Sequence, residues 1–382
     1  MAAPNDYDFI VVGGGTAGLV LANRLSKDSN VRVLVLEAGE DRISDPRITT
    51  PLLYPTLMGT DVDWDVETEP QAALHNKTIR LPLGRALGGS SAVNGQVFLA
   101  TSKVSMDTWC ELGNPGWSWD ILAPYFRKSF TLDLPSPGSR VHSHYHLDYV
   151  EPEFNGTDGP IQVSFPEDTD NPFPKAWVET MRGLGHGVSG DPFSGNITGA
   201  FTNAASVDPS TRQRSDANIG YLKPIQDRKN LVVITGAHVQ RIILHGSSPE
   251  VVASGVQYFH NGETKTANVS AKGEVVLCAG VVNSPKILEL SGIGDPEHLS
   301  SLGIPVKVPN KWVGENLQDH PMTGLSFEVQ DGLKTLDNLL RQDEVATESA
   351  MKEYAESRTL CQPTYSSTPL NLSTTIPSYP HS

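Results

Sequence analysis

The feature that most constrains this fold is a glycine-rich turn between two apolar runs at the start of the chain. Residues 7–12 are mainly apolar after one acidic position, and they lead directly into Gly-Gly-Gly-Thr-Ala-Gly at residues 13–18. A second apolar run follows at residues 31–36. Short runs of this kind are typical of strands buried on both faces of a parallel sheet. The pattern therefore predicts a βαβ unit and an α/β fold.

The turn carries the glycines that a dinucleotide-binding loop needs. Gly13 permits a sharp turn, Gly15 lets backbone N–H groups approach a pyrophosphate, and Gly18 allows the helix to lie close to the strand. The helix that begins at Thr16 and Ala17 is expected to present its N-terminus, with its positive potential, to the phosphates. The turn thus predicts a phosphate-binding loop.

Two further features complete the predicted unit. Ala17, Leu21 and Leu25 repeat at helical spacing, which predicts a helix that can pack back on the sheet. Glu37 ends the second apolar run, where a carboxylate can accept hydrogen bonds from ribose hydroxyls, and we include the adjacent Ala38 in the predicted site. This unit by itself leaves FAD and NAD as alternatives.

A second glycine-rich segment occupies residues 84–97, with the sequence GRALGGSSAVNGQV. Paired glycines followed by paired serines produce a backbone that can press against a flat ligand and offer N–H and O–H donors. A flexible surface loop is the alternative. The segment lies between apolar stretches, however, and buried backbone must find hydrogen-bond partners. We therefore interpret it as part of a binding site.

Composition excludes several classes of function. The formal charge of −15 over 382 residues argues against nucleic acid, whose phosphates require a concentrated basic surface. An uninterrupted apolar stretch long enough for a transmembrane helix is absent from the sequence. The N-terminal residues lack the basic patch and apolar run of a secretory signal, so we expect a cytoplasmic protein. Five N-x-S/T sequons point the other way, toward a secreted lineage.

Metal sites and other catalytic motifs are not favoured. The three cysteines are widely spaced and contain no CxxC pair. Residues 61–72 lack the glycine and the final glutamate of a calcium loop. The histidines at 142, 144 and 146 stand in a segment rich in Pro and Ser, and we expect solvated loop histidines there. Residues 89–92 do not match a GxSxG nucleophile elbow.

With these motifs in place, the chain resembles the glucose–methanol–choline (GMC) oxidoreductases over most of residues 7 to about 325. Segment 84–97 resembles one family signature and segment 280–294 a second. In the second, Ser284 is expected to cap a helix that has Pro285 in its first turn. Shorter matches lie at residues 63–64, 116–119, 124–126, 214–215 and 313–320. The resemblance is closest to the fungal alcohol-oxidase-like and versicolorin-B-synthase-like branches.

The resemblance implies FAD as the cofactor. In the family, the residues matching Asn94–Val97 contact the flavin ring and ribityl region, and a valine matching Val239 touches the adenine end through its backbone. The residues and the resemblance together predict an FAD site made of Gly13, Gly15, Thr16, Ala17, Gly18, Glu37, Ala38, Trp64, Arg85, Ser90, Asn94, Gly95, Gln96, Val97 and Val239.

The expected architecture is a doubly wound, Rossmann-like FAD-binding domain with an incomplete α+β substrate domain. We assign residues 1–325 to the FAD-binding domain, with an insertion near 155–220 that faces the substrate side. Residues 326–382 are expected to form a partial substrate domain and a frayed tail. Family members are longer, and the segment that carries their catalytic histidine has no match here, so we assign no catalytic residue.

Three functions remain open at this stage. The first is an FAD-dependent oxidoreductase that oxidises an alcohol group of a small organic substrate, such as a secondary metabolite, by hydride transfer. The second is a truncated FAD-binding chain with little or no redox activity. The third is a flavin-supported, non-redox cyclase. A missing closing segment is also expected to expose apolar surface and to favour self-association.

Overall fold

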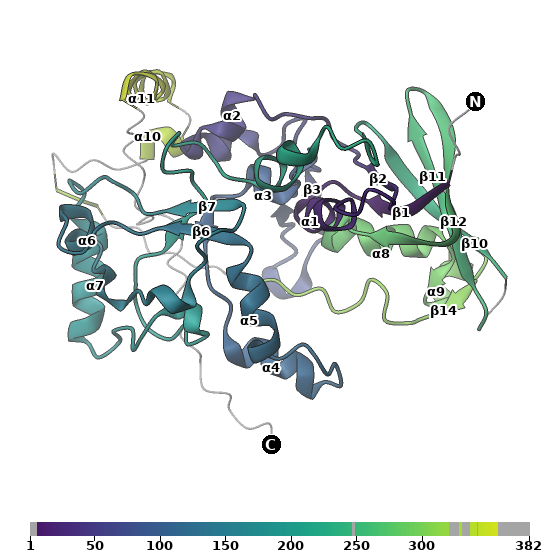
Figure 1. The fold of residues 1–382 in the computed structure, drawn as a ribbon, viewed down its shortest axis with the longest axis horizontal. Helices are drawn as coiled ribbons and strands as arrows, with labels where there is room; N and C mark the ends of the chain where they lie inside the picture. The colour runs from purple at the N-terminus through teal and green to yellow at the C-terminus, as the bar shows by residue number, and fades with distance from the viewer. Residues whose placement is uncertain (1–5, 247–248, 321–327, 331–336, 342, 358–382) are drawn as a thin grey trace. The chain divides into compact units, whose positions relative to one another are not determined.

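The computed structural model describes residues 6–246, 249–320, 328–330, 337–341 and 343–357, which fall into two compact units (Figure 1). Unit 1 comprises Met1–Thr49, Thr56–Asn94 and Asp216–His320. Unit 2 comprises Thr50–Pro55, Gly95–Ser215 and Pro321–Ser382. The expected domain boundary near residue 325 and the tail at 358–382 lie outside the described residues and stay predictions.

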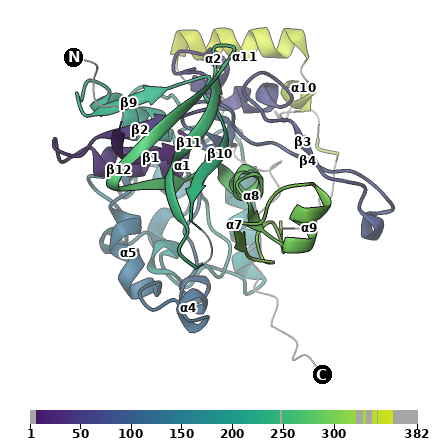
Figure 2. The same ribbon diagram turned by 90° about the vertical axis from the view of Figure 1, so that its right-hand side faces the viewer.

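Unit 1 is built on a six-stranded sheet with the order β10-β11-β12-β1-β2-β9 (Figure 2). Its strands are β1 (Asp6–Val12), β2 (Val33–Leu36), β9 (Leu231–Ile234), β10 (His238–His245), β11 (Val252–His260) and β12 (Glu263–Leu277). Strand β1 pairs in parallel with β2 and β12, and β2 pairs in parallel with β9. Strands β10, β11 and β12 form an antiparallel meander. The parallel pair of β1 and β2 belongs to the predicted βαβ unit, and β9 on one side and the meander on the other extend the sheet.

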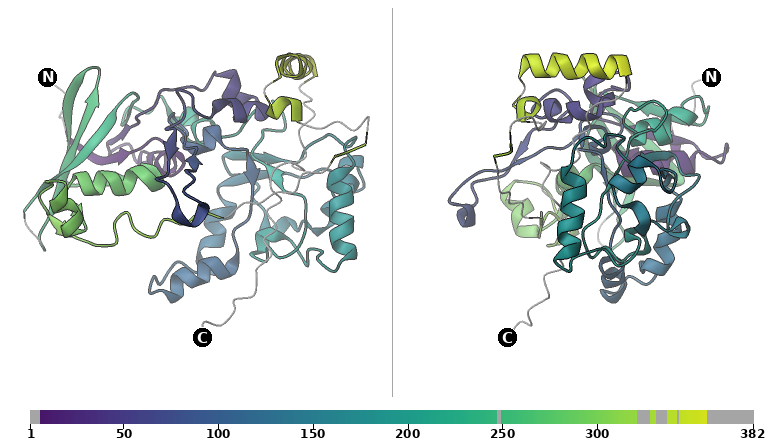
Figure 3. Two further views of the ribbon diagram at one scale, coloured as in Figure 1. Left: turned by 180° about the vertical axis from the view of Figure 1, so that it is seen from behind. Right: turned by 90° about the vertical axis from the view of Figure 1, so that its left-hand side faces the viewer.

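Helices cover both faces of this sheet, which makes it doubly wound. Helix α1 (Thr16–Leu25) approaches the face of β1 that carries Val11. Helix α8 (Gly280–Leu290) buries Ile287 against the opposite face, in one core with Ile10 and Val12. The left view of Figure 3 shows this helix, in green, running alongside the sheet. Because successive side chains of a strand point to opposite faces, neighbouring residues of β1 supply the two cores. The predicted Rossmann-like fold is therefore confirmed.

Two details of these helices differ from expectation. Helix α1 buries Gly18, Leu19 and Ala22, so its buried face is offset from the predicted Ala17, Leu21 and Leu25. The glycine allows the closest approach to the sheet, and it sets which face turns inward.

Helix α8 begins at Gly280, four residues before the expected cap at Ser284, and it contains Pro285 in its interior. Gly280 has φ +82°, which lets the chain turn directly from β12 into the helix. The helix ends at Leu290, with Ser291 as its C-cap residue.

The remaining elements of unit 1 are short. They are α2 (Pro46–Thr49), β3 (Val66–Glu67), β4 (Arg80–Leu81), α3 (Ser90–Val93), β13 (Ile293–Gly294), α9 (Pro296–Ser301), β14 (Val308–Pro309), a π-helical turn at Asn218–Leu222 and 3-10 turns at Ala72–Leu74 and Lys223–Ile225. Among the residues that the structure describes, no helix has the length and apolar character needed to cross a bilayer.

Unit 2 contains a four-stranded sheet with the order β5-β8-β7-β6 and a separate core. Its strands are β5 (Val97–Phe98), β6 (Phe130–Asp133), β7 (Ile161–Ser164) and β8 (Ala204–Ala205), and its helices are α4 (Lys103–Glu111), α5 (Trp119–Arg127), α6 (Arg140–His144), α7 (Phe173–Gly183), α10 (Asp337–Leu340) and α11 (Glu344–Ser357). The core centres on the fully buried Phe130, against which Phe98, Phe126 and Phe193 pack.

The histidine run of unit 2 is not the solvated loop that the sequence suggested. Residues 140–144 form helix α6, whose N-cap Ser139 accepts a hydrogen bond from the backbone of His142. The His142 side chain is buried, and His146 lies 3.3 Å from the Glu179 carboxylate of α7. A serine cap and inward-facing apolar neighbours, among them Tyr145 and Leu147, stabilise this turn.

Candidate functional site: a paired glycine loop and the pocket beside it

The first glycine-rich loop joins β1 to α1 in a conformation that requires glycine. Gly13 has φ +104°, and a Cβ atom there would lie 2.4 Å from the carbonyl oxygen of Cys278. A Cβ atom on Gly18 would lie 1.9 Å from the carbonyl oxygen of Gly13. Contacts this short admit no side chain, so both positions have the backbone roles that the sequence indicated.

The second glycine-rich loop packs directly on the first, backbone against backbone. The Gly88 N–H donates a 2.9 Å hydrogen bond to the Gly14 carbonyl. A Cβ atom on Gly89 would lie 2.7 Å from the α-carbon of Gly15, and one on Gly84 would lie 2.2 Å from the Gly89 carbonyl oxygen. Two sequence segments more than sixty residues apart thus meet in one surface without side chains. The sequence predicted both loops but not their contact.

Glu37 fixes the first loop to the end of β2. Its carboxylate is buried and accepts hydrogen bonds of 2.7 Å from the backbone N–H groups of Gly14 and Gly39, one on each oxygen. Burial raises the pKa of the Glu37 carboxyl, and these N–H donors oppose the shift. A carboxylate oxygen accepts more than one hydrogen bond, so both oxygens keep capacity for a ligand hydroxyl.

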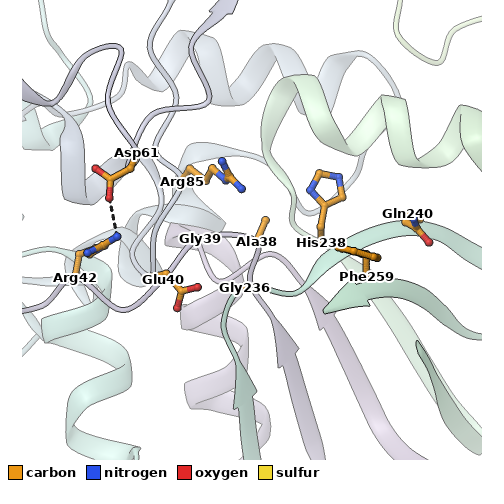
Figure 4. A pocket seen from close by; sticks show the side chains of 10 residues that line it. All are labelled: Ala38, Gly39, Glu40, Arg42, Asp61, Arg85, Gly236, His238, Gln240 and Phe259. Carbon is orange, nitrogen blue, oxygen red and sulfur yellow. Dashed lines mark hydrogen bonds and ion pairs between the residues drawn. The ribbon is translucent and has the colours of Figure 1, made fainter. Parts of the chain in front are cut away.

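A pocket of about 560 Å³ opens beside this acid, at the carboxyl ends of β2 and β9 (Figure 4). It is lined by Ala38, Gly39, Glu40, Arg42, Asp61, Arg85, Gly236, His238, Gln240 and Phe259. In open α/β sheets, ligands bind outside the carboxyl ends of the strands, and the nucleoside of a dinucleotide lies near the acid after the second strand. The pocket therefore lies where this fold accommodates an adenosine.

One wall of the pocket comes from the edge of the antiparallel meander. His238 of β10 and Phe259 of β11 are directly opposite each other in the strand register, so their side chains share a face. Gln240 lies at an irregularity of β10 between Val239 and Arg241, and its side chain also lines the pocket. Figure 4 shows these side chains on the same side of the pocket.

The opposite side of the pocket is charged. Arg42 and Asp61 form an ion pair of 2.6 Å, and Glu40, two residues before Arg42, also lines this side. Arg85 lies between the two sides, with its guanidinium 5.2 Å from the centre of the Trp64 ring. The pocket thus has an aromatic and amide wall facing a polar, charged one.

Trp64 connects Arg85 to His238. Its ring meets the His238 ring edge-on, with 5.7 Å between centroids. Burial lowers the pKa of His238, and the positive charges of Lys286 and Arg85 act in the same direction. This environment therefore favours the neutral imidazole of His238, which presents one nitrogen donor and one nitrogen acceptor.

The other predicted site residues occupy distinct places. Ser90 begins helix α3, and its hydroxyl accepts a hydrogen bond of 3.2 Å from Gly84 in unit 1. Val239 is buried in the core, so only its backbone is available to a ligand. Thr16 and Ala17 are exposed at the start of α1, and Asn94 is the C-cap residue of α3.

Three predicted residues, Gly95, Gln96 and Val97, belong to unit 2. Gln96 is buried with φ +64°, and its carbonyl accepts a 2.9 Å hydrogen bond from the Ser206 backbone. A Cβ atom on Gly95 would lie 3.5 Å from the Tyr54 ring, within ordinary contact distance. Their contact with the flavin stays a prediction.

The arrangement in unit 1 fits FAD. The paired loops form a surface without side chains, which a pyrophosphate can approach, and the exposed start of α1 adds positive potential. Glu37 and the pocket follow at the end of β2, where the ribose and the base of a dinucleotide lie. Sequence reasoning missed His238, Gln240 and Phe259, because only the pairing of β10 with β11 brings them together. It also missed Gly39, whose backbone lies against the Arg85 carbonyl.

Comparison with known proteins gives consistent matches. The family model described as GMC oxidoreductase matches residues 7–322. "Dehydrogenase mpl7" of Monascus purpureus is 38% identical over 360 residues, covering 92% of this chain and 56% of that protein. An oxygen-dependent choline dehydrogenase of Chromohalobacter salexigens is 36% identical over 337 residues, covering 87% of this chain and 56% of that protein.

A solved structure agrees with these matches. An FAD-dependent oxidoreductase from Chaetomium thermophilum has a TM-score of 0.81 at 32% identity, covering 94% of this chain and 60% of that one. The chain thus spans little more than half the length of the curated relatives it matches.

Proposed function

Because the chain belongs to the GMC oxidoreductase family, we propose that it binds FAD through unit 1 and serves the oxidation of an alcohol group of a small organic substrate by hydride transfer. The observation that carries the proposal is the paired glycine loop beside Glu37. FAD-dependent relatives and a dehydrogenase of choline, itself an alcohol, support the reaction class.

The residues of the chain have separate tasks in this proposal. The backbone N–H groups at the start of α1 bind the pyrophosphate, and Glu37 accepts hydrogen bonds from the ribose hydroxyls. The pocket beside Glu37 holds the adenine, close to the backbone of Val239. When bound, FAD supplies a two-electron acceptor for the hydride. We assign Gly95, Gln96 and Val97 to the flavin end on the family resemblance.

A second candidate function is FAD binding with little redox activity. Alcohol oxidation requires an acceptor for the hydroxyl proton, and positioned proton transfer contributes roughly 10²–10⁴-fold to the rate. We assign no side chain among the described residues to this role. The binding of FAD and its reduction are therefore separate expectations, which one experiment can test in turn.

The experiment begins with the absorbance spectrum of the purified chain after incubation with FAD and removal of free flavin. Retained flavin bands support the cofactor assignment, and a colourless protein contradicts it. Primary alcohols of increasing size are then added without oxygen. Loss of the oxidised flavin bands supports the oxidoreductase, whereas a stable spectrum with every alcohol favours the second candidate.

A further inference from the structure

His238 has no assigned task, although its position is the most informative in the pocket. It is the first residue of β10 and lines the pocket, and its ring contacts Trp64 edge-on. Its ring nitrogens make no hydrogen bond to the residues that the structure describes. A half-buried imidazole normally has a partner for its polar atoms. The open side of the pocket is where such a partner has room.

The surroundings of His238 define what that partner is. Phe259 lies beside it on the next strand and offers a flat apolar surface, 44% exposed. Gln240 adds an amide with both a donor and an acceptor. Aromatic surfaces stack on nucleobases, and mixed donor and acceptor groups read the edge of a base. Sugars and phosphates instead fit the charged side, with Arg42, Asp61 and Arg85.

We propose that His238 is a specificity-determining residue for the cofactor, which hydrogen-bonds the adenine while Phe259 supports the face of the base. This inference rests on the proposed function, because it places the adenosine half of FAD in the pocket.

Two cations near His238 support the proposal. Lys286 of α8 and Arg85 of the second glycine loop both disfavour a charged imidazole. A neutral ring serves a neutral base, since it can accept from the adenine amino group or donate to a ring nitrogen. The edge-on contact with Trp64 restricts rotation of the His238 ring.

The test compares three variants of the full chain by calorimetric titration with ADP, which contains the adenosine and phosphates but no flavin. His238→Phe keeps a flat ring and deletes both nitrogens, and we expect ADP to bind about three- to tenfold more weakly. His238→Gln restores a donor and an acceptor and should recover most of the affinity. His245→Phe, at the exposed far end of β10, is the matched control and should bind as the parent does.

A further probe separates the base from the rest of the ligand. UDP carries the same ribose and diphosphate on a smaller base, so its affinity should change less than twofold in His238→Phe. The proposal is overturned if His238→Phe binds ADP within twofold of the parent, or if His238→Gln is as weak as His238→Phe. Parent protein that binds neither ADP nor FAD refutes the proposed function as well. If the parent protein retains FAD but His238→Phe binds ADP as tightly as the parent does, this inference alone is refuted.

Discussion

Two alanine substitutions in the first glycine loop separate its structural role from its binding role. The Cβ atom of Gly18→Ala would lie 1.9 Å from the Gly13 carbonyl oxygen and 3.2 Å from a methyl carbon of Val11. The first contact is with backbone, which no rotamer change relieves. The Cβ atom of Gly15→Ala meets only the α-carbon of Gly89, at 3.6 Å, and its backbone is extended. The two variants are therefore expected to behave differently.

The magnitudes follow from these contacts. Overpacking in Gly18→Ala destabilises the fold by about 3 kcal/mol, the upper end of its usual range. Alanine is about 1 kcal/mol more favourable than glycine in a helix, which offsets part of this loss. Gly18→Ala should therefore lose about 2 kcal/mol of folding free energy, or roughly 4–8 °C in Tm. Gly15→Ala should stay within about 0.5 kcal/mol of the parent. Its methyl group nevertheless occupies the surface that the pyrophosphate approaches, so FAD should bind more than tenfold more weakly, because charge-assisted hydrogen bonds are worth about 1.5–3 kcal/mol.

The assay is thermal unfolding of the protein without cofactor, followed by FAD titration of each folded variant. The reasoning fails if Gly18→Ala has the same Tm as the parent, because the helix then has room for a methyl group that the structure does not show. It also fails if Gly15→Ala retains FAD as tightly as the parent, because the loop would then not touch the pyrophosphate.

Three further predictions concern buried groups. Burial raises the pKa of Glu37 in the folded protein above its ordinary value of 4.5, so the free energy of unfolding is expected to fall as pH rises from 4.5 through the folded pKa. Glu37→Gln should remove this fall, measured by urea unfolding at several pH values. It should also weaken FAD binding, since an amide cannot accept from both Gly14 and Gly39. The pKa of Asp191 is also raised, mainly by burial, so Asp191→Asn should likewise reduce the fall in unfolding free energy with rising pH. An unchanged dependence of stability on pH would argue against its burial in the folded protein. Phe130→Ala should cost about 3–5 kcal/mol, measured by urea unfolding, and a loss below 1 kcal/mol would contradict a close-packed aromatic core.

The sequence predicts the βαβ unit at the start of unit 1 closely. The strands β1 and β2 match the apolar runs at residues 7–12 and 31–36, because strands buried on both faces need apolar residues. The glycines at 13 and 18 are also diagnostic, since the backbone contacts they permit tolerate no other residue. These features are local, and a local pattern specifies them.

The parts that the sequence does not predict depend on distant contacts. The buried face of α1 follows from how closely Gly18 approaches β1, and the apolar repeat of the helix does not reveal it. The early start of α8 depends on the positive φ of Gly280, whereas Pro285 suggested a later one. Proline is tolerated here although it removes one helical hydrogen bond, in a helix whose Ile287 packs in the core of the sheet.

The candidate site shows the same division. Glu37 is predictable because the spacing from the turn places it at the end of β2. The wall made by His238, Gln240 and Phe259 is not, because it requires the register of β10 with β11 and the irregularity at Gln240. The backbone contacts of the paired loops leave a glycine pattern in the sequence, whereas the side chains of the wall from β10 and β11 leave none. With His238 as the proposed specificity determinant, variants of β10 and β11 are the ones expected to change which nucleotide the pocket accepts.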